Sequence, residues 1–419
     1  MLIHSASQLL TIAGGPQRGH DLGSLKVIKD GAVLIEGGVI VETGASEDLL
    51  AKYPDQEQID ARGRVVMPGF VDPHTHVLWA GDRALEFEFR AQGKSYLEIM
   101  EAGGGIVSTV KATRKASLAE LKSQTRKRLQ TMFAHGTTTV EAKTGYGLEM
   151  ETELRSLQAY LELAEEVPQD MVITFLGAHA VPPEYAGDPE GYTALVGREM
   201  LPGIKKWWSK HTSRSLPFVD VFCEEGAFNL SQSRLILERA QSLGFAVKIH
   251  ADEFKNLGGA RLAAELGAVS ADHLVVTSQE DIEALAGSDT VAVALPCTPF
   301  GLAEGDYTPA QEILSAGGLL AVATDLNPGT AWCESMQFAV ALACRYMNLS
   351  PAQAIVAATI NAAAAVGKES EVGSLEPGKK ADIIILDVSD YRHMGYRFGT
   401  NLVHKVIKDG TYVPSEECS

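Results

Sequence analysis

The spacing of hydrophobic positions differs between the two ends of this chain and its middle. Near the amino terminus, apolar segments at residues 26–28, 32–35 and 39–41 are separated by the glycine turns Asp30-Gly31 and Gly37-Gly38, a pattern typical of short β-strands. After residue 380 the pattern returns, with an apolar strand at 382–387 and a predicted hairpin at 403–413. Strands this short need partners to be stable. We therefore expect the two ends to join in one small β-sandwich domain.

Between the ends, strand-like apolar runs alternate with helix-like stretches, which predicts βα repeats around a parallel sheet. Helices are predicted at residues 118–134, 149–166, 231–243 and 259–266, among others. Eight strands are predicted, at residues 69–76, 137–143, 172–179, 219–224, 246–250, 268–273, 291–296 and 319–325.

Eight such units indicate a (β/α)₈ barrel of the TIM type, so the fold class is α/β. A doubly wound open sheet is the alternative, but no GxGxxG turn opens any unit. We expect the β-sandwich to be built from residues 1–66 and 371–419, with the barrel at 67–370 between them.

Composition limits the kinds of partner. A formal net charge of −18 argues against nucleic acid and against anionic membrane surfaces, which select for basic patches. No apolar run is long enough for a transmembrane helix, and the amino terminus is a poor secretory signal. The five cysteines form no CxxC pair, which favours reduced thiols. We expect a cytoplasmic protein with no nucleic-acid or membrane partner, and interpret Cys223 and Cys297 as residues of apolar core strands.

Polar side chains recur where the predicted strands end. The run PGFVDPHTH at 68–76 places His74 and His76 two positions apart, so on an extended strand both face the same side. Other strand ends carry Lys143 with Tyr146, His179, Glu224 with Glu225, His250 with Glu253, His273 and Asp325. In a barrel the carboxyl ends of the strands meet at one mouth, where active sites are built.

Each of these residues also has a simpler interpretation. His179 could cap a strand, Glu253 could begin a helix at 254–266, and Asp325 could form a turn before Asn327. Arg83 could be a surface charge. The glycine run at 103–105 lacks a following GK[ST], so a mobile loop over the mouth is favoured over a phosphate cradle.

As a set, the residues are chemically consistent. Three neutral imidazoles and a carboxylate suit Zn²⁺ or Fe²⁺ and leave a position for water. The metal would lower the pKa of that water toward ~7. A nearby glutamate or histidine could then carry protons between the water and a leaving nitrogen.

These motifs resemble those of the amidohydrolase superfamily. The resemblance rests on PGFVDPHTH, His250, His273, Asp325 and the tail motif GSLEPGKKAD at 373–382, and it covers essentially the whole chain. Six further segments are similar to those of one family within it, the imidazolonepropionases of histidine degradation. They are AQGKSY (91–96), GGGIVST (103–109), EAKTGYG (141–147), LGAH (176–179), HADE (250–253) and TDLNPG (324–329).

The resemblance implies hydrolysis of the ring amide of 4-imidazolone-5-propanoate to N-formimidoyl-L-glutamate, by attack of a metal-bound water on the ring carbonyl. One divalent metal, zinc or iron, would be held by His74, His76, His250 and Asp325. The residues implied to contact substrate are Arg83, Tyr146, His179, Glu253, Asn327, Gly329 and Thr330. Arg83 is the natural partner of the propionate, because a guanidinium fork matches a carboxylate. Glu253, His273 and Asp325 would share the proton transfers and the stabilisation of the oxyanion.

Many binuclear members of the superfamily carry a lysine on the fourth strand, whose carbamate bridges two metals. Here that strand offers Glu224 and Glu225, and Lys143 lies on the second strand, so we expect a single metal. A deaminase of a nucleobase or triazine ring is the nearest rival, and Arg83 argues against it because nucleobases lack a carboxylate. A non-catalytic scaffold is disfavoured because no expected ligand is missing. We expect a small-molecule substrate and a homodimer.

Overall fold

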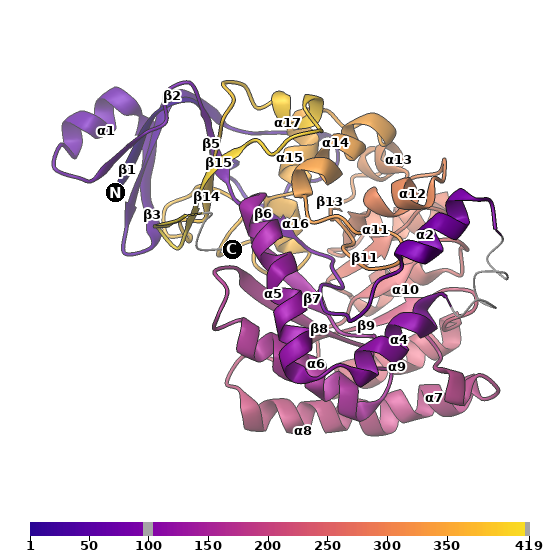
Figure 1. Cartoon of the computed structure of the whole chain (residues 1–419). Helices are drawn as coiled ribbons and strands as arrows, with labels where there is room; N and C mark the ends of the chain where they lie inside the picture. Colours follow the sequence, from indigo (N-terminus) through magenta and orange to yellow (C-terminus); the bar gives the residue numbers. More distant parts are fainter. Residues whose placement is uncertain (95–103, 415–419) are drawn as a thin grey trace.

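The computed structural model describes residues 1–94 and 104–414. Its centre is an eight-stranded parallel sheet whose strands follow one another in chain order (Figure 1). The strands are β6 (Phe70–Asp72), β7 (Thr137–Lys143), β8 (Asp170–Ala178), β9 (Phe218–Cys223), β10 (Ile249–Ala251), β11 (Ser270–His273), β12 (Val291–Ala294) and β13 (Leu320–Val322). A bridge between Thr75 and Leu326 joins the segments that follow β6 and β13. The predicted (β/α)₈ barrel is confirmed.

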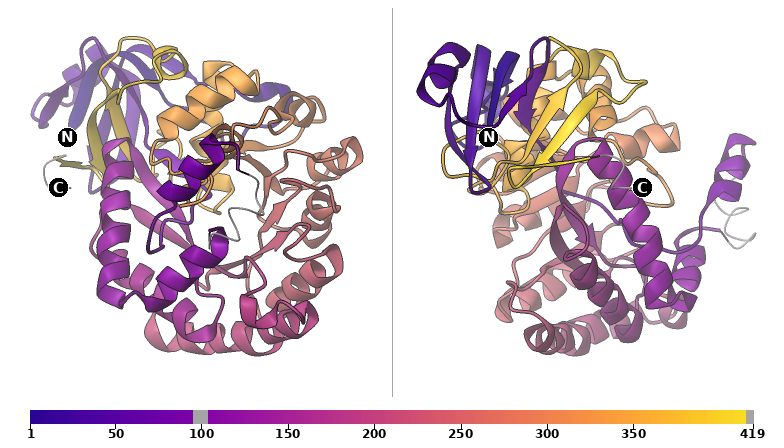
Figure 2. Two further views of the ribbon diagram at one scale, coloured as in Figure 1. Left: turned by 45° about the vertical axis from the view of Figure 1, so that its right-hand side comes forward. Right: turned by 60° about the vertical axis from the view of Figure 1, so that its left-hand side comes forward.

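Helices connect the strands and follow the last of them, and most cover the outside of the barrel (Figure 1; Figure 2). From β6 to β9 they are α2 (Ala84–Ala91), α4 (Ile106–Lys115), α5 (Leu118–Ala134), α6 (Met150–Leu163), α7 (Pro189–Leu195) and α8 (Leu201–His211). From β9 onward they are α9 (Leu230–Ser242), α10 (Gly259–Leu266), α11 (Gln279–Ala286), α12 (Cys297–Leu302), α13 (Ala310–Ser315), α14 (Met336–Tyr346), α15 (Pro351–Ala357) and α16 (Ile360–Ala364). Among helices in the described ranges, none has the length and apolarity required to cross a bilayer.

Local sequence explains several of these boundaries. Ser117 begins α5 with a capping box, in which its side chain accepts from the Glu120 backbone N–H and Glu120 accepts from the Ser117 N–H. Strands β7 and β12 are buried along their whole length, as expected for parallel strands covered on both faces. The helix predicted at residues 259–266 is observed with those bounds as α10, and the alternative in which Glu253 begins a helix from residue 254 is wrong, because residues 252–255 form bends at the barrel mouth. Cys297 is buried as predicted, but it begins α12 and does not lie in a strand.

Both ends of the chain contribute to a second sheet beside the barrel, which we call the end sheet (Figure 1; Figure 2). It consists of β1 (Leu2–Leu10), β2 (Val27–Glu36), β3 (Val39–Ala45), β4 (Gln58–Asp60), β5 (Val65–Pro68), β14 (Ile383–Leu386), β15 (Val403–Lys408) and β16 (Thr411–Val413). The short helix α1 (Ser46–Lys52) packs on this sheet, whereas α17 (His393–Tyr396), between β14 and β15 in the chain, packs against α14 and α15 of the barrel. The prediction that the two chain ends form one small β-domain is confirmed.

The end sheet is tied closely to the barrel. Strand β5 pairs with β14, and only Gly69 separates β5 from β6. A Cβ at Gly69 would lie 2.4 Å from Thr138 of β7, so a side chain does not fit where the chain passes from one sheet to the other. Val65 and Met67 pack into the main core of the barrel, whereas Val66 faces a separate core enclosed by the end sheet. The predicted boundaries at residues 66 and 370 stay a prediction.

The two copies of VIKDG behave differently. At Asp409-Gly410 both residues have positive φ (48° and 75°), and the pair forms the predicted hairpin turn between β15 and β16. The turn predicted at Asp30-Gly31 is wrong, because β2 runs through it with positive φ at Asp30 alone. A Cβ at Gly31 would lie 2.5 Å from the Cβ of Leu9, so this glycine permits close approach of β1. Residues 95, 96 and 103 of the motifs quoted above, and Cys418, lie outside the described residues.

Candidate active site

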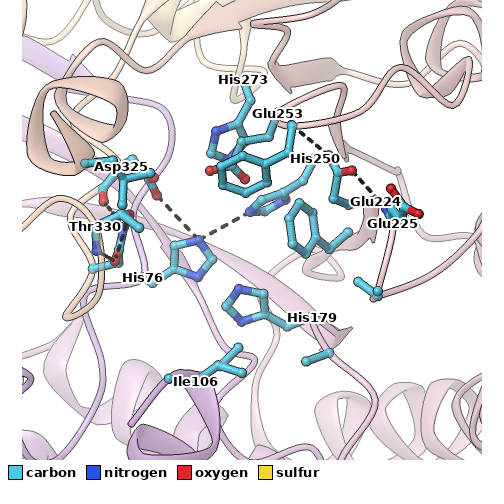
Figure 3. Close-up of a pocket in the computed structure, with 18 of the residues that line it drawn as sticks. His76, Ile106, His179, Glu224, Glu225, His250, Glu253, His273, Asp325 and Thr330 are labelled. Carbon is cyan, nitrogen blue, oxygen red and sulfur yellow. Dashed lines mark hydrogen bonds and ion pairs between the residues drawn. The ribbon is translucent and has the colours of Figure 1, made fainter. Parts of the chain in front are cut away.

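The predicted metal ligands converge at the carboxyl ends of the barrel strands, and Figure 3 shows three of them, His76, His250 and Asp325. His74 and His76 follow β6, His250 lies in β10, and Asp325 follows β13. All four side chains are buried. His76, His250 and Asp325 line a cavity of about 820 Å³ at the barrel mouth.

Short distances connect the candidate ligand atoms. Asp325 Oδ1 lies 3.5 Å from His74 Nε2 and 3.6 Å from His76 Nε2, and the Nε2 atoms of His76 and His250 are 3.3 Å apart. The ligand atoms of His74, His76 and Asp325 fall within 4.8 Å of one another, and so do those of His74, His250 and His273. The two groups share His74, so His273 lies close to the four predicted ligands.

Two buried aspartates orient the imidazoles from below. His74 Nδ1 lies 2.6 Å from Asp272 Oδ2, and His250 Nδ1 lies 3.0 Å from Asp220 Oδ2. A carboxylate accepts hydrogen bonds, so His74 Nδ1 carries the proton and His74 Nε2 presents its lone pair to the mouth, whereas His250 Nδ1 lies at ion-pair distance from Asp220 without a hydrogen bond to it within the described residues. Burial lowers the pKa of His74 well below its usual value, and Lys143 acts in the same direction.

A fully buried ion-pair network lies beneath these aspartates. Lys143 Nζ is 2.7 Å from Asp220, 3.0 Å from Glu141 and 3.5 Å from Asp272. Lys248 Nζ is 2.8 Å from Glu141 and donates to the Pro73 carbonyl. Although burial alone would lower the pKa of Lys143, the three carboxylates raise it. Lys143 therefore lies below the site, away from the mouth where the sequence placed it.

The donor set fits a divalent metal such as zinc or iron. His74 Nε2 is buried and has no hydrogen-bond partner, which a metal bond would satisfy. Three imidazole nitrogens and one carboxylate are donors that both metals accept. Burial, as the main cause, lowers the pKa of His76 and His273 as well, which keeps these rings neutral. The third histidine–acid group, His74 with Glu141 and Asp272, already has lysine counter-ions.

The proposed proton-transfer residues lie beside the ligands. Glu253 Oε2 is 3.6 Å from His273 Nε2, and both side chains line the cavity. Burial raises the pKa of Glu253 well above its ordinary value, and Asp325 and Glu224 add to the effect. Burial also raises the pKa of Asp325 to about 6, against the hydrogen bond from Thr298. Glu224 accepts hydrogen bonds from the backbone N–H groups of residues 254 and 255, and so fixes the loop that carries Glu253.

Two of the predicted substrate contacts form an aromatic wall beside His76. The His179 ring stacks on His76 with centroids 4.7 Å apart, and Tyr146 lies 5.3 Å from His179. His179 Nδ1 is 3.0 Å from the Gly145 carbonyl, so Nδ1 donates and Nε2 is left as an acceptor. Burial lowers the pKa of His179 to about 3, so the ring is neutral. Burial raises the pKa of Tyr146, so its hydroxyl stays a donor.

The remaining predicted contacts lie on α2 and on the loop after β13. The Asn327 side chain closes this loop, accepting from the backbone N–H groups of Gly329 and Thr330 at 2.8 Å each. Arg83 lies against the loop at Gly329, where a Cβ would come within 2.1 Å of Arg83 Nη1. Asn327, Thr330 and Arg83 line the cavity. The structure thus brings together the predicted metal ligands, proton-transfer residues and substrate contacts, but not Lys143, and the roles of these residues stay a prediction.

The backbone at the mouth is strained at two of these residues. His273 and Asp325 have φ of 78° and 54°, in the left-handed region that side chains disfavour. Such residues cost about 1–3 kcal/mol each and persist where surrounding structure holds them. The strained backbone at His273 and Asp325 costs free energy of folding, but it directs both side chains into the cavity.

Sequence reasoning missed the layer below the ligands. Glu141, Asp220, Lys248 and Asp272 were not singled out, although a signal was present. Each is a charged residue inside a predicted buried strand, and Glu141 and Lys248 stand two positions before Lys143 and His250, on the same face. Because unpaired charges are rarely buried, charged residues at these positions indicate a paired internal network.

Comparison with known proteins identifies the family. A model described as "Amidohydrolase family" matches residues 65–413, and one described as "Imidazolonepropionase-like composite domain, bacteria" matches residues 31–55. The chain is 52% identical over 413 residues to the imidazolonepropionase of Herpetosiphon aurantiacus, with 98% of this chain and 96% of that one covered. It is 48% identical over 422 residues to that of Chloroflexus aggregans, with 100% and 99% covered.

Solved structures show the same fold at low identity. A mutant of atrazine chlorohydrolase from Arthrobacter aurescens, complexed with zinc and atraton, matches with a TM-score of 0.76 at 16% identity, covering 100% of this chain and 98% of that one. An adenosine deaminase from Xanthomonas campestris with bound zinc matches with a TM-score of 0.68 at 21% identity, covering 98% and 92%. These similarities support the fold, and the close relatives support the family. The chain belongs to the imidazolonepropionase family of amidohydrolases and is a hydrolase that acts on C–N bonds.

Proposed function

We propose that this enzyme hydrolyses the ring amide of 4-imidazolone-5-propanoate to N-formimidoyl-L-glutamate, a step of histidine degradation. The observation that carries the proposal is the cavity at the barrel mouth. The buried His₃Asp cluster lies at this cavity with buried Glu253 beside it, and two arginines of α2, Arg83 and Arg90, line the same cavity. The cluster supports metal-assisted hydrolysis, and the arginines support a substrate with a carboxylate. Relatives at 52% and 48% identity are named imidazolonepropionases.

We assign the binding of one zinc or iron ion to His74, His76, His250 and Asp325. When bound, such an ion lowers the pKa of a coordinated water toward ~7 and polarises a carbonyl oxygen. The chain prepares this set of donors, since Asp272 holds the proton of His74 away from the mouth and Asp220 places a carboxylate 3.0 Å from His250 Nδ1.

Glu253 serves as the proton carrier in this proposal. Its carboxylate takes a proton from water as the water oxygen forms a bond to the ring carbonyl carbon. The raised pKa suits it to hold that proton and then deliver it to the ring nitrogen, as the C–N amide bond breaks. The carbonyl carbon becomes a carboxylate, and the nitrogen becomes part of the formimidoyl group.

The other residues bind and orient the ring. His179 Nε2 is an acceptor and can take a hydrogen bond from a ring N–H, while the Tyr146 hydroxyl remains a donor. Neutral His273, 3.6 Å from Glu253, can stabilise charge that develops on the carbonyl oxygen. Arg83 borders the side of the cavity where the propionate would lie.

The test is a spectrophotometric assay with freshly generated 4-imidazolone-5-propanoate, with a metal-stripped sample as the control. We expect metal-dependent loss of substrate with formimidoylglutamate as the product. Absence of turnover in a fully metallated sample, together with ammonia release from a ring amine, would replace this proposal with a deaminase activity. Occurrence as a homodimer and a cytoplasmic location stay predictions, to be checked by light scattering and by fractionation.

A further inference from the structure

Helix α2 presents three charged side chains to one wall of the cavity. Arg83 at its N-cap, Glu86 and Arg90 are spaced i, i+3 and i+7, so they share one face of the helix. All three line the cavity. In Figure 2 (left) α2 lies across the barrel mouth, beside α4.

Arg83 already has a carboxylate partner within the protein. Its Nε donates to Glu86 Oε2 at 2.8 Å, and its Nη2 donates to Glu86 Oε1. Glu86 is 8% exposed and also accepts from the Gly105 N–H at 2.8 Å. The paired edge of the guanidinium is therefore occupied, and the charges of Arg83 and Glu86 cancel.

Arg90 is in a different situation. Its Nη2 donates to the Gly329 carbonyl at 2.7 Å, while its Nε is buried without a hydrogen-bond partner. Within residues 1–94 and 104–414, no carboxylate lies within 4.0 Å of the Arg90 guanidinium nitrogens. Arg83, Glu86 and Arg90 together therefore carry one net positive charge, and Glu86 acts on Arg90 only at longer range, without a salt bridge to it.

The rest of the cavity is unfavourable for an anion. Acidic side chains line it at Glu224, Glu225, Glu253, Glu304 and Asp325. Lysines also line it at Lys94 and Lys255, but both are exposed to solvent, where a charge is screened. A substrate carboxylate is thus best placed at the α2 wall, next to a guanidinium that has no salt bridge within the described residues.

We propose that Arg90 is a specificity-determining residue, which supplies the unmatched positive charge that selects a substrate bearing a carboxylate. Arg83, held by Glu86, then orients the carboxylate, and Arg90 provides the net attraction. The proposal rests on the proposed function for the identity of the substrate. The competing explanation is that Arg90 only fixes the loop after β13 through the Gly329 carbonyl.

Binding of unreactive analogues to the metal-loaded protein separates the two explanations. The ligands are imidazole-4-propanoate, which keeps the carboxylate, and 4-propylimidazole, which lacks it, and affinities are measured by calorimetry. We expect Arg90→Gln to weaken binding of the acid about 10- to 100-fold, as for the loss of a hydrogen bond to a charged group. Binding of the neutral ligand should change less than about twofold, because uncharged contacts are kept.

Two further variants make the result decisive. Arg90→Lys keeps the charge and should retain most of the preference for the acid, whereas Arg126→Gln on α5, which pairs with exposed Glu166, should match wild type. Equal losses for both ligands in Arg90→Gln would show a purely structural role, and unchanged acid binding would likewise overturn the proposal. These measurements need no turnover. A chain that binds the acid selectively through Arg90 but fails to hydrolyse the imidazolone would contradict the proposed function alone.

Discussion

Replacement of Asp272 by asparagine tests whether the layer below the ligands controls metal binding. Asp272 is fully buried, and its Oδ2 lies 2.6 Å from His74 Nδ1. Its Oδ1 accepts from Ser270 at 2.6 Å. Asparagine keeps the shape and can still accept from His74, but it removes the charge that strengthens this hydrogen bond and makes His74 Nε2 a better donor to a metal.

The loss of folding stability and the loss of metal affinity can be estimated separately from the structure. Lys143 keeps Asp220 at 2.7 Å and Glu141 at 3.0 Å, and Lys248 keeps Glu141 at 2.8 Å, so neither lysine loses its nearest partner. We therefore expect a loss of folding stability of only about 1–3 kcal/mol, the range for one weakened buried hydrogen bond. Metal affinity should fall about 10- to 100-fold, the usual effect of changing a residue that orients a histidine ligand.

Zinc affinity is measured by competition with a chromophoric chelator, and stability by urea unfolding of the metal-stripped protein. Asp289→Asn is the matched control, because Asp289 is exposed and, within the described residues, forms a salt bridge only with Arg18. The control should change neither quantity measurably, as for most surface ion pairs. Zinc affinity of Asp272→Asn within twofold of wild type, in a folded protein, would refute the role given to this aspartate.

Three other substitutions test separate parts of the site. Glu253→Gln should keep metal content but lower kcat about 10²- to 10⁴-fold, the range for a lost general base, and near-normal turnover would remove Glu253 from that role. Lys143→Met leaves three buried carboxylates with one lysine and should lower the free energy of unfolding, measured in urea, by about 3–5 kcal/mol. A loss below about 1 kcal/mol would contradict the charge pairing described here. Gly329→Ala places a Cβ 2.1 Å from Arg83 Nη1 and should raise KM more than it lowers kcat, and unchanged steady-state kinetics would show that Arg83 can move without loss.

Much of the barrel could be predicted from the sequence because its strands are short, apolar and regularly separated. Predicted and observed bounds agree for β7 and α5, where a buried run and a capping box mark the ends. The strand predicted at residues 246–250 starts three residues before β10, because residues 246–248 pair only through an isolated bridge at Val247. The sequence wrongly predicts a turn at Asp30-Gly31, because a glycine required for close packing has the same local sequence as a glycine required for a turn.

The candidate site could be predicted as a set of residues, but their partners could not. Strand-end positions and motif resemblance led to His74, His250 and Asp325, which the structure brings together. Nothing local indicates that Arg83 is paired with Glu86, or that Lys143 turns inward to Asp220, 77 residues further along the chain. Such contacts depend on the barrel's closure and on the side-chain directions it imposes, so they appear only in three dimensions.

The two-part end sheet also determines the order in which the molecule can fold. Strand β5, which leads through Gly69 into the strand before His74, pairs on one side with β14 at Ile383–Leu386. During synthesis at 5–20 residues per second, roughly 320 residues and about 15–60 s separate the emergence of these two strands. Until then β5 has an open edge, which is a template for wrong pairing between chains. The native geometry around His74 and His76 therefore forms only after the carboxyl-terminal strands are made. A chain that stalls before residue 383 leaves β5 with an unpaired apolar edge, which chaperones would have to protect.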